Sequence, residues 1–387
     1  MSTVHFFNPQ NDLALANGSP NFTPPLSALR LASAGASLPL WYGEPGDKFI
    51  GAVNALWLDE ICMTFNPEVM PVSAITPCDT PVPWGWSPAA RRNLERLGFD
   101  PAKLPSDETL QNWRQASSRT SHAGVMRNFA ETFACQLNLD ELNAPFIATD
   151  IREALAQIDR LPVAMIKLPW SNSGRGQQVS DRTTPAELRT RINGMINRQG
   201  AVEITPYYAN KCADFAMLWQ NGRFTGYSLF ETDTHGGWTR NLLASDSAIE
   251  NRLQKIFGGV LDFEKIADFF TRYIHTLRSE TGYSGPVGVD FIVADNLNGK
   301  KSVIPVEINL RRTMGHVAHN LKAKYLAPET EAYFSVVPTE YIDEPFYSVK
   351  NCIVSQKRLE KGNLDLVTPG GHFRFILSAA LSRKGSD

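Results

Sequence analysis

Hydrophobic and polar positions at the start of the chain predict a strand, a helix and a second strand, in that order. Residues 4–7 form a short apolar run, and residues 38–41 form another. Between them, Thr23 precedes an apolar pattern with helical spacing that stops at Gly35, as expected of a capped helix. This strand–loop–helix–strand order is typical of a small Rossmann-like unit with parallel strands.

The middle of the chain has a different pattern, in which short strands alternate with helices. It predicts helices at residues 122–137, 151–158 and 184–200, and strands at residues 163–167, 177–180 and 201–205. A boundary at residues 118–121 separates this part from the first. We therefore expect an N-terminal domain over residues 1–120 and a small α+β lobe over residues 121–205.

The last part of the chain, residues 206–387, is expected to form a larger lobe. Segments that read as β-strands lie at residues 215–220, 224–231, 287–294 and 302–309. A strongly amphipathic helix with Phe269 and Phe270 on its apolar stripe separates the two pairs and ends at Gly282. The chain as a whole is therefore predicted to be an α/β protein of the α+β kind.

The last two β segments are joined through Asn298-Gly299, a strong hairpin signal because a type I′ turn needs positive φ at both positions. A two-residue loop there fixes the register. One face then pairs apolar residues only: Val293 with Ile304, Phe291 with Val306, and Val289 with Ile308. The other face pairs Asp290 with Glu307 and Gly288 with Asn309. Pro305 cannot donate to a ladder and predicts an edge strand or a bulge.

The predicted register places the carboxylates of Asp290 and Glu307 directly opposite each other, with their Cβ atoms about 5 Å apart. Opposed like charges destabilise a sheet unless something neutralises them. Mg²⁺ does so, because it prefers oxygen ligands and commonly shares one or two carboxylates with substrate phosphates. Asn309 adds a neutral oxygen on the same face. We predict a metal site at Asp290, Glu307 and Asn309, with an exposed acidic hairpin as the alternative.

Composition limits the classes of partner. The 387 residues suit two or three domains, and 38 Lys and Arg against 40 Asp and Glu give a net charge of -2. This balance offers no general basic field for nucleic acid or an anionic membrane. The five cysteines are far apart, the start lacks the features of a signal peptide, and no apolar run approaches the length of a membrane helix. A cytoplasmic protein is expected.

A glycine-rich segment lies between two predicted strands in the small lobe and contains Ser173, Gly174, Arg175 and Gly176. It is neither a Walker A loop nor a dinucleotide fingerprint, because both lead into a helix. A turn of this composition can fold over phosphates with its backbone N–H groups. A plain surface turn is an equally good interpretation.

Several segments in this order resemble the ATP-grasp superfamily from about residue 121 to residue 325. They are Ile166-Lys167-Leu168-Pro169, Ser173-Gly174-Arg175-Gly176, Val202-Glu203-Ile204, Gly288-Val289-Asp290-Phe291 and Pro305-Val306-Glu307-Ile308-Asn309-Leu310-Arg311. The resemblance implies an N-terminal Rossmann-like domain, a small lobe with the glycine-rich loop and a large lobe with the metal. It also implies that ATP lies between the two lobes.

Carried over by position, the resemblance implies a nucleotide site in the small lobe. Lys167 looks like the lysine that contacts the α- and β-phosphates and adenine. Arg127 stands where members have a second phosphate-binding lysine. Glu203 is similar to the acidic residue of the adenine strand, with the Ile204 backbone at the adenine edge, and Asp214 is a candidate for the ribose hydroxyls.

The same resemblance implies the catalytic residues. Asp290, Glu307 and Asn309 match the metal ligands, and Arg311 matches an arginine that supports the acyl phosphate or its oxyanion. The basic residue that reaches the γ-phosphate has no clear match. His235, Arg240 and Lys211 are the candidates for it.

The reaction implied is transfer of the γ-phosphoryl group of ATP to a carboxylate, followed by attack of an amine or another nucleophile on the acyl phosphate. Two Mg²⁺ ions, for which Mn²⁺ can substitute, would share Glu307. A kinase of the same fold and a non-catalytic ATP-binding regulator are the alternatives. The resemblance allows a homodimer. It names neither the acid nor the amine, and it leaves open the roles of residues 8–12 and 340–387.

Overall fold

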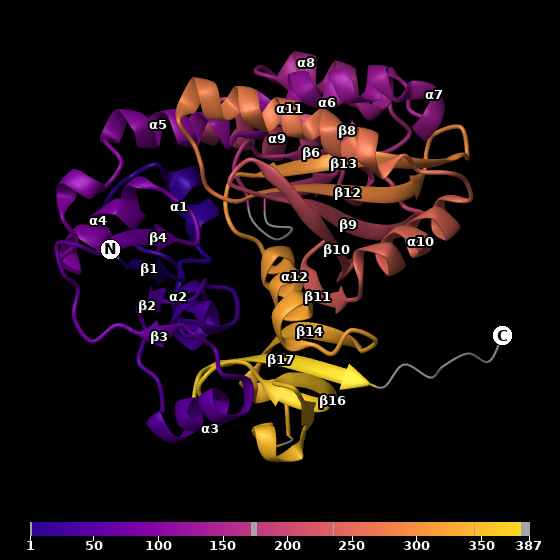
Figure 1. Ribbon diagram of the computed structural model, residues 1–387. Coiled ribbons are helices and arrows are strands. Elements are labelled where there is room, and N and C mark those ends of the chain that lie inside the picture. The colour runs from indigo at the N-terminus through magenta and orange to yellow at the C-terminus, as the bar shows by residue number, and fades with distance from the viewer. Residues whose placement is uncertain (1, 172–175, 235, 344, 381–387) are drawn as a thin grey trace.

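The computed structural model describes residues 2–171, 176–234, 236–343 and 345–380. Three sheets organise this part of the chain, and they lie side by side rather than stacked (Figure 1). The first is built by residues 3–83, the second by residues 146–206 and the third by residues 211–380. None of the described helices has both the length and the apolar character needed to cross a bilayer.

The first sheet is parallel, as the strand–loop–helix–strand pattern predicts. Its order is β3-β2-β1-β4, with strands at β1 (Thr3–Phe6), β2 (Lys48–Phe49), β3 (Met70–Pro71) and β4 (Thr80–Pro83). The helices around it are α1 (Asn11–Asn17), α2 (Leu26–Ala34), α3 (Ala55–Phe65), α4 (Pro88–Arg96) and α5 (Asp107–Ala116).

One predicted strand of this sheet is wrong. Residues 38–41 form a 3₁₀ helix, η1 (Leu38–Trp41), and the strand that pairs with β1 is β2. All four residues of η1 are buried, so an apolar run here reflects burial on every side and not a strand. Pro39 also lacks the N–H that a central strand must donate.

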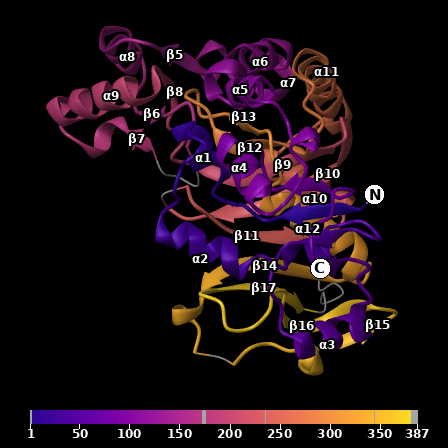
Figure 2. The same cartoon turned by 90° about the vertical axis from the view of Figure 1, so that its left-hand side faces the viewer.

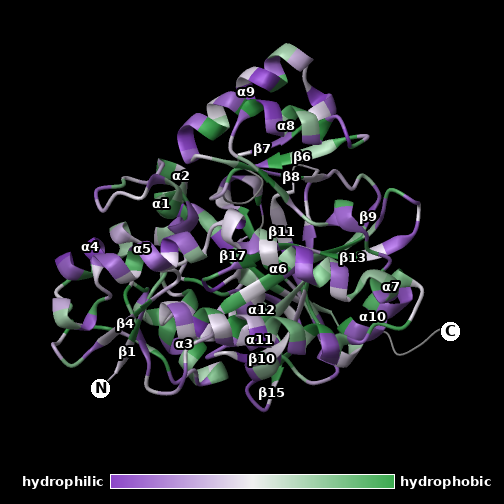
Figure 3. Ribbon diagram, turned by 90° about the horizontal axis from the view of Figure 1, so that it is seen from above, coloured by the Kyte–Doolittle hydropathy of each residue, from purple (hydrophilic) through white to green (hydrophobic). Residues whose placement is uncertain are grey.

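The second sheet is antiparallel and forms a small lobe with two helices. Its order is β5-β8-β6-β7, with strands at β5 (Phe146–Ala148), β6 (Ala164–Lys167), β7 (Gln177–Val179) and β8 (Val202–Pro206). The helices α8 (Ile151–Ile158) and α9 (Pro185–Gln199) cover one face. Figure 2 shows this lobe projecting from the rest of the molecule, and Figure 3 shows hydrophilic and hydrophobic residues alternating along α9.

The third sheet is antiparallel throughout, with the order β13-β12-β9-β10-β11-β14-β17-β16-β15. Its strands are β9 (Lys211–Gln220), β10 (Arg223–Thr232), β11 (Trp238–Leu243), β12 (Val287–Asp295), β13 (Lys301–Asn309), β14 (Glu331–Pro338), β15 (Ile353–Ser355), β16 (Arg358–Asp365) and β17 (Phe373–Ala380). The helices that pack on it are α6 (Arg119–Thr132), α7 (Ala134–Leu137), α10 (Asp246–Phe257), α11 (Phe263–Thr281) and α12 (Met314–Tyr325). The remaining 3₁₀ turns are η2 (Pro101–Lys103), η3 (Glu141–Asn143), η4 (Ser180–Arg182), η5 (Thr339–Tyr341) and η6 (Val349–Asn351).

Two cores hold this large lobe. In the first, α6 and α11 bury Phe129 and Phe270 against Phe291 of β12. In the second, α12 and the C-terminal strands pack against the N-terminal domain, where Trp41 meets Tyr325. The predicted fold class is confirmed: a parallel Rossmann-like domain, a small lobe and a large antiparallel lobe.

The β12–β13 hairpin has the predicted register in its inner half only. Asp290 pairs with Glu307 and Gly288 with Asn309, as predicted. Beyond a bulge at Val306 the register shifts by one, so that Phe291 pairs with Pro305. The tip is a longer loop in which Gly299 has positive φ while Asn298 does not, so the predicted two-residue turn is wrong. Pro305 lies on an edge strand and beside a bulge, and both placements were predicted.

His122 of α6 gives the fold a testable dependence on pH. Burial lowers the pKa of this side chain to about 4, and its ring meets Tyr273 of α11 edge-on. A histidine whose pKa is depressed on folding contributes stability above its unfolded pKa near 6.5 and loses it as the pH falls toward 4.

In the parent protein, the free energy of unfolding should fall as the pH is lowered from 6.5 to 4, by up to about 1.4 kcal/mol per pH unit. We expect His122→Phe to remove this contribution. Urea unfolding at several pH values measures this slope. The difference between the two proteins at pH 8 reports packing alone, because both side chains are then neutral. Parallel curves for the two proteins below pH 6.5 would contradict the assignment.

Candidate functional site

A cleft of about 830 Å³ lies between the small lobe and the large sheet. Strands β6 and β8 supply Lys167 and Glu203 from one side, and β12 and β13 supply Asp290 and Glu307 from the other. Apolar side chains from both lobes line its inner end, namely Met126, Met165, Ile292, Ile304 and Val306. The cleft therefore has apolar side chains beside a charged end on the large sheet.

Asp290 and Glu307 form the centre of the charged end. They are direct cross-strand partners, and Asn309 Nδ2 donates to Asp290 Oδ2 at 2.9 Å. Burial, joined by the charge of Glu307, raises the pKa of Asp290 to about 7. Burial and the neighbouring carboxylate thus both disfavour the charged form of Asp290.

Arg119, the first residue of α6, offsets part of that charge, and the sequence analysis did not identify it. Its Nη2 donates to Glu307 Oε1 at 2.5 Å, and its Nη1 donates to the Leu168 carbonyl at 2.8 Å and to Ser171 Oγ at 2.7 Å. A buried cation in the first turn of a helix faces the positive end of the helix dipole. An arginine at this unfavourable position could have pointed to a functional residue from the sequence alone, once Ser118 is recognised as the N-cap of α6.

Arg311 approaches the same pair from the end of β13 and is fixed by the N-terminal domain. Its Nε and Nη2 both donate to Asp12 on α1, at 2.6–2.9 Å. The charges of Asp12 and Glu307 raise the pKa of Arg311 against the opposing effect of burial, so it remains a cation. Asp12 belongs to the segment 8–12 whose role the sequence left open.

Lys167 and Glu203 face each other across β6 and β8. They are register partners, their Nζ and Oε1 atoms are 3.3 Å apart, and both side chains are largely buried. The Ile204 side chain is fully buried on the other face of β8. The backbone of this strand therefore borders the cleft with an acidic and a basic side chain beside it.

Asp214 of β9 lies deeper along the same face of the sheet. Its Oδ2 is 2.8 Å from Lys211 Nζ and accepts from Thr232 Oγ1 at 3.0 Å. All three residues line the cleft. Asp214, the candidate for the ribose hydroxyls, and Lys211, one candidate for the γ-phosphate, thus lie together.

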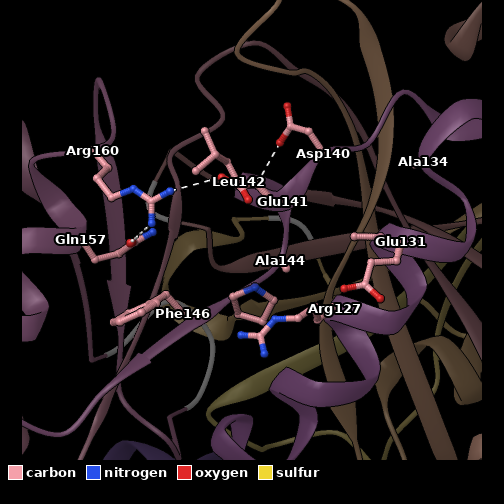
Figure 4. Close-up of a pocket in the computed structure, with 12 residues that line it drawn as sticks. Arg127, Glu131, Ala134, Asp140, Glu141, Leu142, Ala144, Phe146, Gln157 and Arg160 are labelled. Carbon is pink, nitrogen blue, oxygen red and sulfur yellow. Dashed lines mark hydrogen bonds and ion pairs between the residues drawn. The ribbon is translucent and has the colours of Figure 1, made fainter.

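Arg127 does not lie in this cleft. It lines a separate cavity of about 380 Å³ with Glu131, Asp140 and Phe146 (Figure 4). Arg127 follows Arg119 by eight residues, which corresponds to about 12 Å along the helix axis and a rotation of about 80°. Of these two arginines, Arg119 reaches the Asp290–Glu307 pair and Arg127 does not.

Arg240 also lies away from the cleft. It forms a two-pronged ion pair with Glu231 at 2.8 and 2.9 Å and stacks over the Tyr333 ring at 4.2 Å. Alternation along β11 explains this, since Asn241 beside it points to the cleft side of the sheet. The remaining γ-phosphate candidate, His235, lies outside the described residues, as do Ser173, Gly174 and Arg175 of the glycine-rich loop.

Gly176, the last residue of that loop, is described. Its φ of +72° lies in the left-handed region, and a Cβ atom there would come within 2.9 Å of the Leu168 side chain. Its carbonyl accepts from the Leu168 N–H at 3.1 Å. Glycine is therefore required to close the turn between β6 and β7.

The donor set suits Mg²⁺ with nucleotide phosphates better than a closed metal cage. Two carboxylates and the Asn309 amide lie together on one face of the sheet, and no group of three or more His, Cys, Asp or Glu that could hold a metal gathers among the described residues. Mg²⁺ usually keeps waters and phosphate oxygens among its ligands and needs only one or two carboxylates. A divalent cation would offset the repulsion between the Asp290 and Glu307 carboxylates.

A second pocket of about 370 Å³ opens on the other side of the Asp290–Glu307 pair. It shares Arg119, Gln177 and Phe230 with the cleft and extends between α12 and the N-terminal domain. Arg311 and Thr313 line it as well. The charged pair therefore stands where two cavities meet.

Comparison with solved structures finds similar folds. One is N5-carboxyaminoimidazole synthetase from Staphylococcus aureus complexed with ADP, at 10% identity over 99% of this chain and 94% of that chain, with a TM-score of 0.46. A second is biotin carboxylase from Campylobacter jejuni complexed with an ATP analogue, at 11% identity over 98% of this chain and 87% of that chain, with a TM-score of 0.48. A third is an ATP-grasp RimK domain protein from Sphaerobacter thermophilus, at 12% identity over 71% of this chain and 96% of that chain, with a TM-score of 0.36.

No protein-family model matches the sequence, and a comparison with curated proteins finds no relative. The roles of individual residues therefore rest on the geometry described above.

Proposed function

We propose that this chain is an Mg²⁺- and ATP-dependent ligase that activates a carboxylate as an acyl phosphate and joins it to an amine or a similar nucleophile. The observation that carries the proposal is the placement of Asp290, Glu307 and Asn309 at the junction of a nucleotide-sized cleft and a second pocket. Phosphoryl transfer needs positioning and charge neutralisation more than a protein nucleophile.

In this proposal the adenine lies in the apolar end of the cleft, beside the Ile204 backbone and Glu203. Asp214 binds the ribose, and Lys167 contacts the α- and β-phosphates. Arg119 provides the second phosphate contact, in place of Arg127.

Asp290, Glu307 and Asn309 would hold the Mg²⁺, which neutralises charge on the phosphates when it is bound. Arg311 orients the carboxylate of the acid and stabilises the charge that moves onto the acyl oxygen. An oxygen of the acid forms a bond to the γ-phosphorus as the bond to the bridging oxygen breaks and ADP leaves. The amine nitrogen then forms the C–N bond, phosphate leaves with the C–O electron pair, and the nitrogen gives up a proton.

The test is to incubate the purified protein with Mg–ATP and pooled carboxylates and amines, and to measure ADP and phosphate. Phosphate release that requires both an acid and an amine supports the ligase. A stable phosphorylated product would support the kinase alternative. Nucleotide that raises the melting temperature while no pool yields ADP would contradict both catalytic readings.

The two arginines of α6 provide a prediction about nucleotide binding. We expect Arg119→Met to weaken ATP binding about 10- to 100-fold, because a charge-assisted contact to phosphate is lost from a desolvated site. Arg127→Met is the matched control and should leave the affinity within twofold, because its side chain lies in the other cavity. Calorimetric titration with a non-hydrolysable ATP analogue measures both. The opposite ranking would return the role to Arg127.

A further inference from the structure

The second pocket has a mixed lining, in which apolar side chains from distant parts of the chain stand beside polar ones such as Asn241, Asn309 and Thr313. Strands of the large sheet, α12 and the N-terminal domain all contribute apolar or aromatic side chains to it, namely Pro9, Leu31, Trp84, Phe230, Trp238, Met314, Val336 and Phe373. Three of these residues, Pro9, Leu31 and Trp84, come from the N-terminal domain. The pocket is therefore a chamber whose apolar part is assembled from distant parts of the chain.

The charged groups at this chamber are gathered at its junction with the nucleotide cleft. Among the described lining residues they are Arg119, Arg311, Asp290 and Glu307. Each arginine is already matched by a carboxylate, Arg119 by Glu307 and Arg311 by Asp12. A phosphate or a second carboxylate on the ligand would therefore have to compete with these carboxylates for a cationic partner, and burying a charge costs several kcal/mol unless it is paired.

The polar groups that remain favour a carboxylate over an ammonium group. Met314 and Gly315 occupy the first two positions of α12, where the backbone N–H groups have no partner inside the helix and the helix dipole is positive. Trp238 Nε1 donates to Asn241 Oδ1 at 2.9 Å, and Asn241 Nδ2 donates to Ser228 Oγ at 2.6 Å. The Ser228 hydroxyl thus accepts a hydrogen bond from Asn241, and its own O–H can still donate at the pocket wall.

Gly315 allows helix α12 and strand β10 to approach each other closely at this wall. A Cβ atom at residue 315 would lie 2.8 Å from Ser228 Oγ, so the glycine lets the start of α12 approach β10. The carboxylate end of a ligand can then meet donors from α12 and β10 at one point. The rest of the ligand must extend among the apolar walls.

We propose that the acid activated by this enzyme is a monocarboxylate with an aromatic or long aliphatic group and no phosphate or second carboxylate. This inference rests on the proposed function and goes beyond it by naming the substrate class. The carboxylate lies at the junction, near Arg311 and the start of α12. The apolar group occupies the chamber between Trp84, Trp238 and Phe373.

A hydroxylamine assay tests the substrate class without knowledge of the natural amine. Hydroxylamine attacks an acyl phosphate to give a hydroxamate and phosphate, so each acid can be scored separately with Mg–ATP. We expect aryl and long-chain monocarboxylates to give at least about tenfold higher kcat/KM than acetate, dicarboxylates or phosphorylated acids. A phosphorylated or dicarboxylic acid as the best substrate would overturn the proposal.

A variant pair locates the acid in the chamber. Val336→Lys places a charge on the apolar wall, and we expect kcat/KM for the preferred acid to fall about tenfold or more while KM for ATP stays within twofold. Ser335→Lys is the matched control, because alternation along β14 points it to the opposite face. Equal effects of the two substitutions would overturn the location.

Direct binding separates a failure of this inference from a failure of the proposed function. Calorimetry measures the binding of the same acids to protein saturated with Mg²⁺ and a non-hydrolysable ATP analogue. If apolar monocarboxylates bind and Val336→Lys weakens them while no acid yields hydroxamate, the substrate class stands and the ligase proposal fails. If no apolar monocarboxylate binds, the substrate class fails whatever the turnover.

Discussion

Glu307→Gln is expected to lower kcat for ADP formation about 10³-fold while the protein stays folded. The amide keeps the size of the side chain but loses the charge that would hold Mg²⁺ and that pairs with Arg119 Nη2 at 2.5 Å. Steady-state ADP release at saturating Mg–ATP measures the effect, and circular dichroism checks the fold.

Glu231→Gln is the matched control for this substitution. Glu231 is an exposed carboxylate on the same sheet, paired with Arg240 and away from the cleft, so its loss should leave kcat within twofold. A Glu307→Gln protein with the activity of the parent would remove the basis of the metal site.

Replacing the partner carboxylate, Asp290, should make the protein more stable against unfolding. Burial and the charge of Glu307 raise the pKa of Asp290 to about 7. An acid whose pKa rises on folding loses stability as the pH increases between its unfolded and folded values, so the full cost is present above pH 7. Asp290→Asn should therefore raise the free energy of unfolding at pH 8 by roughly 1 to 4 kcal/mol in metal-free buffer, while it abolishes turnover. Denaturant unfolding with and without Mg²⁺ checks both halves.

Arg311→Met is expected to lower kcat about 10²-fold, because the cation that orients the acid and stabilises the acyl oxygen is lost. Asp12→Asn should lower kcat about tenfold with little change in KM for ATP. The amide loses the charge and one of the two accepting oxygens that fix the guanidinium, so Arg311 stays in place but is less well oriented.

Two further substitutions make this assignment specific. Asp12→Glu keeps the charge and should recover part of the loss. Lys324→Met removes another ion pair between the N-terminal domain and the large lobe, with Glu44 at 3.1 Å, and should leave kcat within twofold. If Lys324→Met were as damaging as Asp12→Asn, the contact at Asp12 would act through domain packing and not through Arg311.

The register of the β12–β13 hairpin was predictable at its inner end because two independent features agreed there. Alternation placed the apolar residues on one face, and Pro305 required an edge or a bulge. The outer half was not predictable, because Asn298-Gly299 is compatible with more than one loop length. The structure uses the longer loop, with Asn296 Oδ1 accepting from the N–H groups of Asn298 and Lys300.

Contacts between residues far apart in the sequence were not predictable. Asp12 and Arg311 are 299 positions apart, and no local pattern connects them. Arg119 was hidden by its place at a predicted domain boundary, and spacing alone could not separate it from Arg127. The apolar run at Leu38–Trp41 was misread because complete burial erases the periodicity that distinguishes a strand from a helical turn.

The bulge at Val306 has a consequence for how this hairpin can vary. One extra residue on β13 absorbs the register shift between the loop tip and the Asp290–Glu307 pair. The tip can therefore gain or lose residues, or exchange its sequence, while the two carboxylates keep their alignment. The outer end of the hairpin can therefore vary in length and sequence, while the inner end keeps a fixed geometry.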